Sequence, residues 1–173
     1  MSLPAHPATA ALGDLEDVLA AILPHAARVA VLGDLGLARA LADRGNRVLA
    51  LLDTPPSQRQ TKRALRAAKG AAAPALAILR ARALPCAPAA LDGIVAAGPA
   101  EVAALPAALA RGSRLILVAG LAGAPGLPGW LGGRRGAARE EHTRALLTAG
   151  LHDVRQLVVG RVGKVVITHG ARP

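Results

Sequence analysis

Short apolar runs alternate along this chain with segments in which apolar residues recur every three or four positions. The runs are rich in Val, Leu and Ile and have the length of buried strands, whereas the second spacing is that of amphipathic helices. Gly and Pro residues separate the two kinds of segment. The predicted strands are residues 28–32, 47–52, 75–80, 91–97, 113–119, 154–159 and 162–168, and the predicted helices are residues 14–23, 35–44, 58–69, 101–110 and 140–149.

The order of these elements predicts an α/β protein built on a mostly parallel sheet. Strands that alternate with helices pair in parallel, because each helix returns the chain to the same end of the sheet. The last two strands are separated only by a Gly160-Arg161 turn and therefore form a C-terminal antiparallel hairpin. The chain has 173 residues, which suits one domain over residues 13–173, preceded by a Pro- and Ala-rich flexible tail over residues 1–12.

Composition limits the core and the chemistry. Apolar residues make up 53% of the chain, but Phe and Tyr are absent and Trp130 is the single aromatic residue, so aliphatic side chains must fill the core. With Cys86 as the only cysteine, an intrachain disulfide and a thiolate metal cluster are excluded, and the histidines show no metal-ligand spacing. Neither a secretory signal nor a bilayer-spanning apolar run is present, so we expect a cytoplasmic protein without a membrane partner.

The formal charge of +10 raises the possibility of an anionic partner. A basic surface attracts nucleic acid or an acidic protein over long distances. RNA-binding surfaces commonly add aromatic stacking platforms, which this chain lacks, so nucleic acid is possible but not favoured. The Ala-, Gly- and Arg-rich composition offers a second explanation, in which the charge is compositional, and the two explanations stay open.

Two basic stretches are candidate partner-binding sites. Arg59, Arg63 and Arg66 recur at intervals of three and four and share one face of the predicted helix over residues 58–69. Trp130 precedes Arg134 and Arg135 in a Gly- and Pro-rich loop, and exposed Trp and Arg are typical anchors of protein interfaces, including those of homo-oligomers. The alternative for both stretches is an ordinary solvated surface.

Four local strings, in order, resemble the class I S-adenosylmethionine-dependent methyltransferases. Residues 47–56 are similar to that family's second strand, and residues 83–95 to the Leu-Pro segment that leads into its fourth strand. Residues 110–118 resemble the turn and fifth strand, and residues 146–154 the entry into the C-terminal hairpin. The resemblance implies a Rossmann-like, doubly wound sheet with helices on both faces, and S-adenosylmethionine as cofactor. It also implies that Asp53 holds the ribose hydroxyls and that the segment at Leu84 lies beside the adenine.

The chain departs from the family at the first strand and before the Leu-Pro segment. The family carries an acid two residues before a Gly-x-Gly-x-Gly loop, but here Val31 holds the acid position and the loop is about two residues short. Glycines matter there because they allow the backbone to approach a cofactor at a helix N-terminus. Arg80 stands where the family has an Asp that accepts a hydrogen bond from adenine.

The predicted cofactor-binding residues are therefore Gly33, Asp34, Gly36, Asp53 and Leu84, and no catalytic residue is predicted. Asp34 and Asp53 have a second interpretation as helix caps. The leading hypothesis is a methyltransferase-like pseudoenzyme that binds a partner. Its alternatives are an active methyltransferase acting on a small acceptor and a basic module binding nucleic acid or an acidic protein. The fragment Gly33-x-x-Gly36 alone is a weak indication of a nicotinamide-dinucleotide enzyme.

Overall fold

A computed structural model of the chain describes residues 7–52, 76–79, 84–97, 102–120, 137–159 and 165–173. These residues form one seven-stranded sheet in the order β3-β2-β1-β4-β5-β7-β6. All neighbouring pairs are parallel except those made by β7, which runs antiparallel to both β5 and β6. The strands are β1 (Arg28–Leu32), β2 (Arg47–Leu51), β3 (Leu76–Leu79), β4 (Leu91–Ala96), β5 (Leu109–Gly120), β6 (His152–Val159) and β7 (Val165–Ala171).

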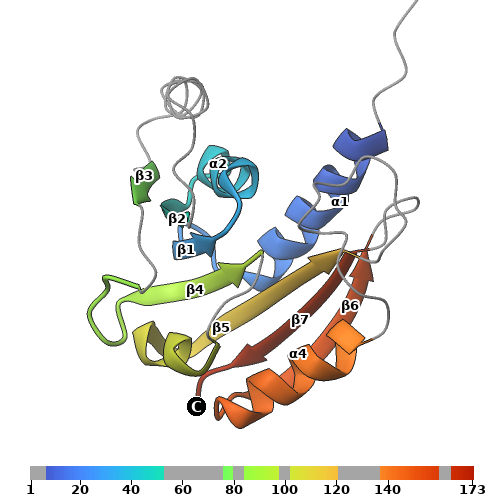
Figure 1. The fold of residues 1–173 in the computed structure, drawn as a ribbon. Coiled ribbons are helices and arrows are strands. Elements are labelled where there is room, and N and C mark those ends of the chain that lie inside the picture. Colours follow the sequence, from blue (N-terminus) through green and yellow to red (C-terminus); the bar gives the residue numbers. More distant parts are fainter. Residues whose placement is uncertain (1–6, 53–75, 80–83, 98–101, 121–136, 160–164) are drawn as a thin grey trace, which may run out of the picture.

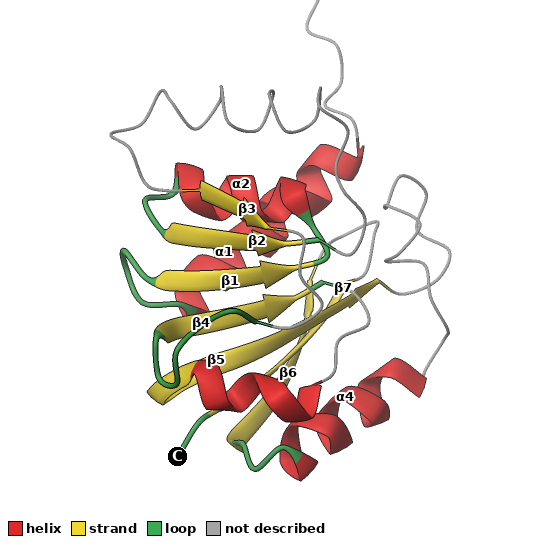
Figure 2. Cartoon of the chain, turned by 60° about the vertical axis from the view of Figure 1, so that its left-hand side comes forward, coloured by secondary structure: helices red, strands yellow, loops and turns green. Residues whose placement is uncertain are grey.

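Helices cover both faces of this sheet (Figures 1 and 2). Helices α1 (Pro7–Ile22) and α2 (Leu35–Asp43) lie on one face, and the 3₁₀ helix η1 (Val102–Ala108) and α4 (Ala137–Thr148) lie on the other. Each face has its own aliphatic core, because alternate residues of a strand point to opposite sides. In β1, for example, Val29 and Val31 belong to the α1–α2 core and Ala30 to the η1–α4 core.

The predicted fold class is confirmed: the sheet is doubly wound and mostly parallel and closes with an antiparallel C-terminal pair. The limits of β1 to β4 agree with the sequence pattern to within one residue, and β1 coincides with its predicted range. β5 is longer than predicted, and β7 spans Val165–Ala171 in place of the predicted residues 162–168. The helix predicted over residues 58–69 lies outside the described residues.

α1 and η1 differ most from the predicted helices, and α4 begins at Ala137 and not at residue 140. α1 begins at Pro7 and not at residue 14, so residues 7–12 are helical although we expected them in the tail. Proline suits the first helical position, where its missing N–H has no intrahelical partner to lose. The helix predicted over residues 101–110 is the 3₁₀ helix η1, which contains Pro106, and Leu109 already begins β5. Proline inside an α-helix removes a hydrogen bond and clashes with the preceding turn.

Arg111 and Gly112, which lie between the predicted helix over residues 101–110 and the predicted strand over residues 113–119, belong to an irregular part of β5. The register of β5 on β4 shifts between the pairs Leu91–Leu109 and Gly93–Arg114. Gly112 has a φ of +75°, a conformation that suits glycine, and its N–H donates to the carbonyl of Arg172 at 2.9 Å. β5 therefore continues through Gly112 and includes residues on both sides of it.

Polar side chains tie strands together at the amino end of the sheet, where the parallel strands begin. Arg28 donates from its backbone N–H and from its guanidinium to Asp92. Arg114 of β5 donates to Nδ1 of His169 at 2.9 Å and to Asp153 at 3.2 Å, and Arg155 donates to Asp153 at 2.9 Å. These contacts join β1 to β4 and β5 to β6 and β7.

Candidate cofactor site

The switch point of the sheet is the place where ligands bind in folds of this type. The chain runs outward from β1 through β2 to β3 and then returns to β4 on the other side of β1, so the crevice lies between the carboxyl ends of β1 and β4. The N–H of Ala97 donates to the carbonyl of Leu32 at 2.9 Å, and the N–H of Gly33 donates to the carbonyl of Leu51 at 2.9 Å. The end of β1 is thus held between its two neighbours.

Only Gly33 and Asp34 separate β1 from α2. Gly33 has a φ of +88°, so the tight turn depends on a residue without a side chain at this position. Asp34 is the N-cap of α2, and its Oδ1 accepts from the N–H of Leu37 at 2.8 Å. The predicted short loop is therefore present, and the helix begins directly above the end of the strand.

The carboxylate of Asp34 accepts a hydrogen bond from the first turn of α2. Burial raises the pKa of Asp34, and the hydrogen bonds from the backbone of Leu37 and Gly36 oppose this rise. A Cβ at Gly36 would lie 3.2 Å from Oδ1 of Asp34, so a residue without a side chain two positions after the cap leaves room for the carboxylate. The capping role that the sequence offered for Asp34 is formed in the structure, and a cofactor contact by the same side chain stays a prediction.

Val31, at the position where the family has an acid, is fully buried. Its side chain belongs to the α1–α2 core together with Val29 and Leu37. An acid at this position would carry a charge into an aliphatic cluster, where burial without a partner is costly. Among the described residues, the end of β1 therefore offers a ligand backbone atoms but no carboxylate other than that of Asp34.

Leu84 precedes β4 and is half-buried against the η1–α4 core, as is Cys86. The structure thus brings Gly33, Asp34 and Gly36 together in one turn and places Leu84 on the approach to the neighbouring strand. The remaining predicted positions lie outside the described residues: Asp53, Arg80, Arg59, Arg63, Arg66, Trp130, Arg134 and Arg135.

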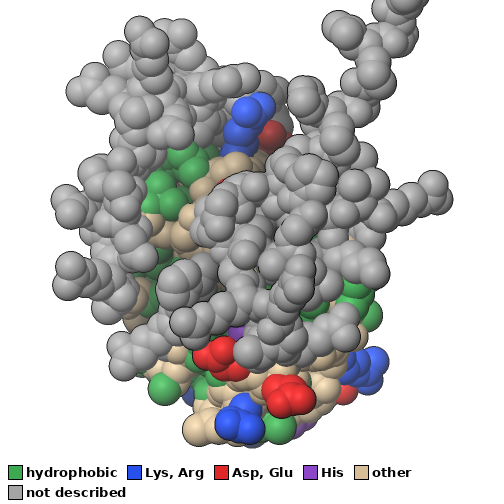
Figure 3. Space-filling view, turned by 45° about the vertical axis from the view of Figure 1, so that its right-hand side comes forward, with side chains coloured by type: hydrophobic (Ala, Val, Ile, Leu, Met, Phe, Trp, Pro, Cys, Tyr) green, Lys and Arg blue, Asp and Glu red, His purple; other side chains and the backbone are tan. Residues whose placement is uncertain are grey.

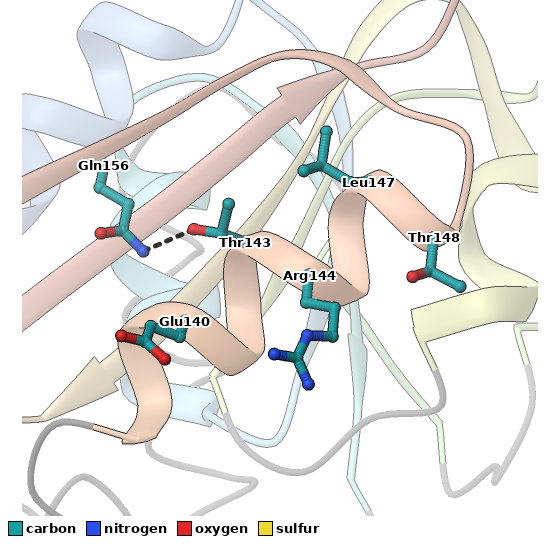
Figure 4. A pocket seen from close by; sticks show the side chains of 6 residues that line it. All are labelled: Glu140, Thr143, Arg144, Leu147, Thr148 and Gln156. Carbon is teal, nitrogen blue, oxygen red and sulfur yellow. Dashed lines mark hydrogen bonds between the residues drawn. The ribbon is translucent and has the colours of Figure 1, made fainter.

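A groove between α4 and the edge strand β6 was not predicted (Figure 4). It has a volume of about 480 Å³. Two of its lining residues are joined by a hydrogen bond, in which the Gln156 amide donates to the Thr143 hydroxyl at 2.9 Å. A signal for it exists in the sequence, because the helix residues follow the spacing of one helical face. The groove is lined by Glu140, Thr143, Arg144, Leu147, Thr148 and Gln156.

His142 is half-buried on α4. Its Nδ1 atom is buried without a hydrogen-bond partner among the described residues, and burial lowers the pKa of its imidazole. The described residues contain no group of three His, Cys, Asp or Glu side chains arranged as metal ligands.

The described part of the chain has no patch of one charge on the face shown in Figure 3. Acidic and basic side chains lie next to one another there. Most of the positive excess belongs to segments outside the described residues, among them residues 53–75 and 121–136. None of the described helices could span a bilayer.

The strand order, the antiparallel β7 and the helices on both faces define the fold of the class I S-adenosylmethionine-dependent methyltransferases. A methyltransferase of this kind from Aquifex aeolicus superposes with a TM-score of 0.70 at 17% identity, over 96% of this chain and 94% of that one. The 1,6-didemethyltoxoflavin-N1-methyltransferase of Burkholderia thailandensis, solved with S-adenosylhomocysteine, gives a TM-score of 0.65 at 20% identity over 95% and 79% of the two chains.

The same fold occurs in a protein described by a different reaction. The [4+2]-cyclase SpnF superposes with a TM-score of 0.67 at 15% identity, over 92% of this chain and 80% of that one. No protein-family model matches the sequence, and no curated protein matches it either. At these identities the comparisons show the fold, and the reaction has to be argued from the site.

Proposed function

We propose that this chain is a methyltransferase-fold domain with a reduced S-adenosylmethionine site, which acts by binding a partner and not by transferring a methyl group. The observation that carries the proposal is the two-residue turn between β1 and α2, in which Asp34 caps the helix with its own carboxylate. In folds of this type a ligand is met by the free N–H groups of that helix start. Here one of those groups, that of Leu37, is already bonded to Asp34.

The apolar end of β1 supports the proposal independently. A ribose or amino-acid moiety needs an acceptor for its hydroxyl or ammonium hydrogens, and Val31 supplies none. Polar ligand atoms that lose water without gaining a partner cost binding free energy of about 1–3 kcal/mol each. Two missing acids, at Val31 and Arg80, would on this basis weaken cofactor binding by several orders of magnitude.

The alternative is an active methyltransferase that holds S-adenosylmethionine through backbone contacts and Asp53. It is supported by the shared fold, since the Burkholderia thailandensis neighbour was solved with S-adenosylhomocysteine. The acceptor would be a small molecule. A basic module that binds nucleic acid or an acidic protein is the third possibility, and it rests on the net charge of +10.

Isothermal titration calorimetry of the purified chain with S-adenosylmethionine and with S-adenosylhomocysteine tests the proposal. We expect no binding heat with either ligand up to millimolar concentration. Circular dichroism of the same sample shows that the protein is folded, so that an absent signal reports on the site.

Micromolar binding of either ligand would contradict the proposal and favour the active enzyme. The Asp53→Ala variant then serves as the decisive control. If it abolishes binding, the ligand occupies the family's site, whereas Asp17→Ala, which removes an exposed carboxylate of α1, should leave the affinity unchanged.

A further inference from the structure

One end of the β5–β7–β6 part of the sheet, the end next to the C-terminus in Figure 1, is rich in arginine. Arg155 of β6 lies opposite His169 of β7, and Arg114 of β5 reaches the same His169 with its guanidinium. The basic side chains described at this end are Arg111, Arg114, Arg155 and Arg172. Asp153 is the one acidic side chain described there, so positive charge is in excess even after the terminal carboxylate of Pro173 is counted.

Asp153 holds two of these guanidinium groups in place. Its carboxylate accepts from Arg155 at 2.9 Å and from Arg114 at 3.2 Å, and these hydrogen bonds lower the pKa of the carboxyl, which therefore stays charged. Arg114 is fixed a second time, because it also donates to Nδ1 of His169 at 2.9 Å. Asp153 has a φ of 51° within the register irregularity of β6, a conformation that costs free energy in a residue other than glycine. The irregular start of β6 thus places one carboxylate where it orients two arginines.

The two oriented guanidinium groups keep most of their hydrogen-bond donors for other acceptors. Each guanidinium carries five N–H groups, and described residues accept from two of those of Arg114 and from one of those of Arg155. Both side chains reach solvent, since Arg155 is 68% exposed and Arg114 is 29% exposed. An anionic group that arrives from solvent would meet donors whose positions are already set, which reduces the entropy lost on binding.

An apolar side chain lies beside the arginines on the same face of the sheet. Leu157 follows Arg155 by two residues and therefore projects from the face of β6 opposite to the one on which Gln156 meets α4. Val159, two residues further on, is buried in the α1–α2 core, whereas Leu157 is 41% exposed. α1 therefore covers β6 at Val159 and leaves an open surface formed by Arg114, Arg155 and Leu157, which we call the arginine–leucine surface.

We propose that the arginine–leucine surface binds an acidic segment of a partner protein, in which carboxylate side chains flank an apolar one. Carboxylates match the planar fork of a guanidinium, as Asp153 does within the chain. An apolar side chain of the partner would cover Leu157, a contact that the phosphate backbone of a nucleic acid does not offer. The described residues also contain no Phe, Tyr or Trp on which a nucleobase could stack. This assignment rests on the proposed function, in which the chain binds a partner, and gives that partner a place and a chemistry.

Fluorescence anisotropy of the full chain with a fluorescein-labelled peptide of glutamate and leucine tests this proposal. We expect saturable binding, which is lost when glutamine replaces glutamate in the peptide. Arg155→Gln should weaken the affinity about tenfold, because a guanidinium at the centre of an interface commonly contributes strongly to binding. The matched control is Arg144→Gln, which removes the same charge at an exposed position of α4 and should leave the affinity nearly unchanged. Leu157→Gln should also weaken binding, although it leaves the net charge as it is.

Absent binding of the glutamate peptide overturns the proposal, and so do equal losses in Arg155→Gln and Arg144→Gln. Duplex DNA is the second probe. If DNA binds more tightly than the peptide and loses affinity in Arg155→Gln but not in Leu157→Gln, the surface recognises phosphate and the proposal is wrong. The titration with S-adenosylmethionine decides the proposed function separately, because the two sites lie at opposite ends of the strands. A chain that binds neither the peptide nor the cofactor loses this surface and keeps its reduced cofactor site.

Discussion

The protonation state of His169 follows from its neighbour. A guanidinium group only donates hydrogen bonds, so the contact from Arg114 requires that Nδ1 of His169 accepts and carries no proton. Burial lowers the pKa of His169, and the positive charge of Arg114 lowers it further. The side chain is 5% exposed, so the neutral imidazole is part of the folded state.

Folding stability should therefore fall on mild acidification. The unfolded chain protonates its histidines as the pH drops through their ordinary pKa of about 6.5, whereas folded His169 resists protonation, so the free energy of unfolding decreases in this window. We expect His169→Gln, which keeps an acceptor for Arg114, to give a shallower loss of stability between about pH 7 and about pH 5. Urea denaturation at a series of pH values measures this slope.

The control for this prediction is His25→Gln, at an exposed position in the turn before β1, which should retain the slope of the natural chain. A part of the slope should remain in His169→Gln, because burial also lowers the pKa of His142. Identical slopes in the natural chain and in His169→Gln would refute the assigned role.

The role of a single residue could be predicted from the sequence where its partner is close along the chain. The capping role of Asp34 depends on Leu37, three positions later, and was one of two stated possibilities. The role of His169 could not be predicted, because Arg114 is 55 positions away and meets it only through the pairing of β5 with β7.

At the scale of elements, Gly93 of β4 packs closely against Leu23, the residue that follows α1. A Cβ built on Gly93 of β4 would lie 2.4 Å from Cδ2 of Leu23, and Leu23 is itself buried. The absent side chain at Gly93 thus makes room for the segment that follows α1. Small residues in a strand allow this kind of close contact with a covering element.

Gly93→Ala should destabilise the fold by about 1–3 kcal/mol, since overpacking forces neighbouring side chains out of their preferred conformations. The cost should shrink in the Leu23→Ala background, where the conflicting atoms are gone, and a double-mutant cycle measures that coupling. Additive effects of the two substitutions would mean that the cost comes from the strand backbone and not from Leu23.

Elements were predictable where one periodicity is uninterrupted. Residues 28–32 are a run of buried-strand composition between polar turns, and β1 coincides with them. Two predictions were wrong next to prolines, because proline can either begin or interrupt a helix. Pro7 begins α1, where we expected a tail, and Pro106 lies inside a 3₁₀ helix, where we expected an α-helix. The long strand β5 was shortened in the prediction, because Gly112 has the same signature in a turn and in a bulge.

At the scale of the whole molecule, the positive charge is unevenly distributed along the chain. The described residues are nearly balanced, with pairs such as Arg28 with Asp92 and Arg44 with Asp17. The positive excess belongs to segments that begin at the carboxyl ends of β2, β3, β5 and β6. Whether these segments bind an anionic partner stays a prediction.

Charge reversal tests whether that localisation has a function. The triple variant Arg59→Glu, Arg63→Glu and Arg66→Glu should elute from a heparin column at a lower salt concentration than the natural chain. Each lost contact between a cationic side chain and the anionic polymer weakens binding and reduces its salt dependence. The comparison variant reverses Arg39, Arg47 and Arg111, which lie in the described part of the chain. Equal losses in both variants would mean that only total charge matters.

The site could be predicted only in part. The end of β1 with its short turn follows from local sequence, and the fold resemblance points to the switch point. The α4–β6 groove was not predicted, because it combines a helix and a strand that are far from obvious neighbours in the sequence. The residues of α4 that line it are mostly polar, and such a helix face does not indicate which element it will lie against.

The contacts at the amino end of the sheet also have a consequence for how this chain can change. Arg28 with Asp92, and Arg114 with His169, join strands at the end opposite the switch point. The contacts that join the strands and the predicted cofactor site thereby lie at opposite ends of the same strands. Segments grafted after β2 or β5 would leave those contacts in place, so the scaffold can accept new specificities without first acquiring compensating stability. A variant with a new segment at either position should therefore keep a melting temperature close to that of the natural chain.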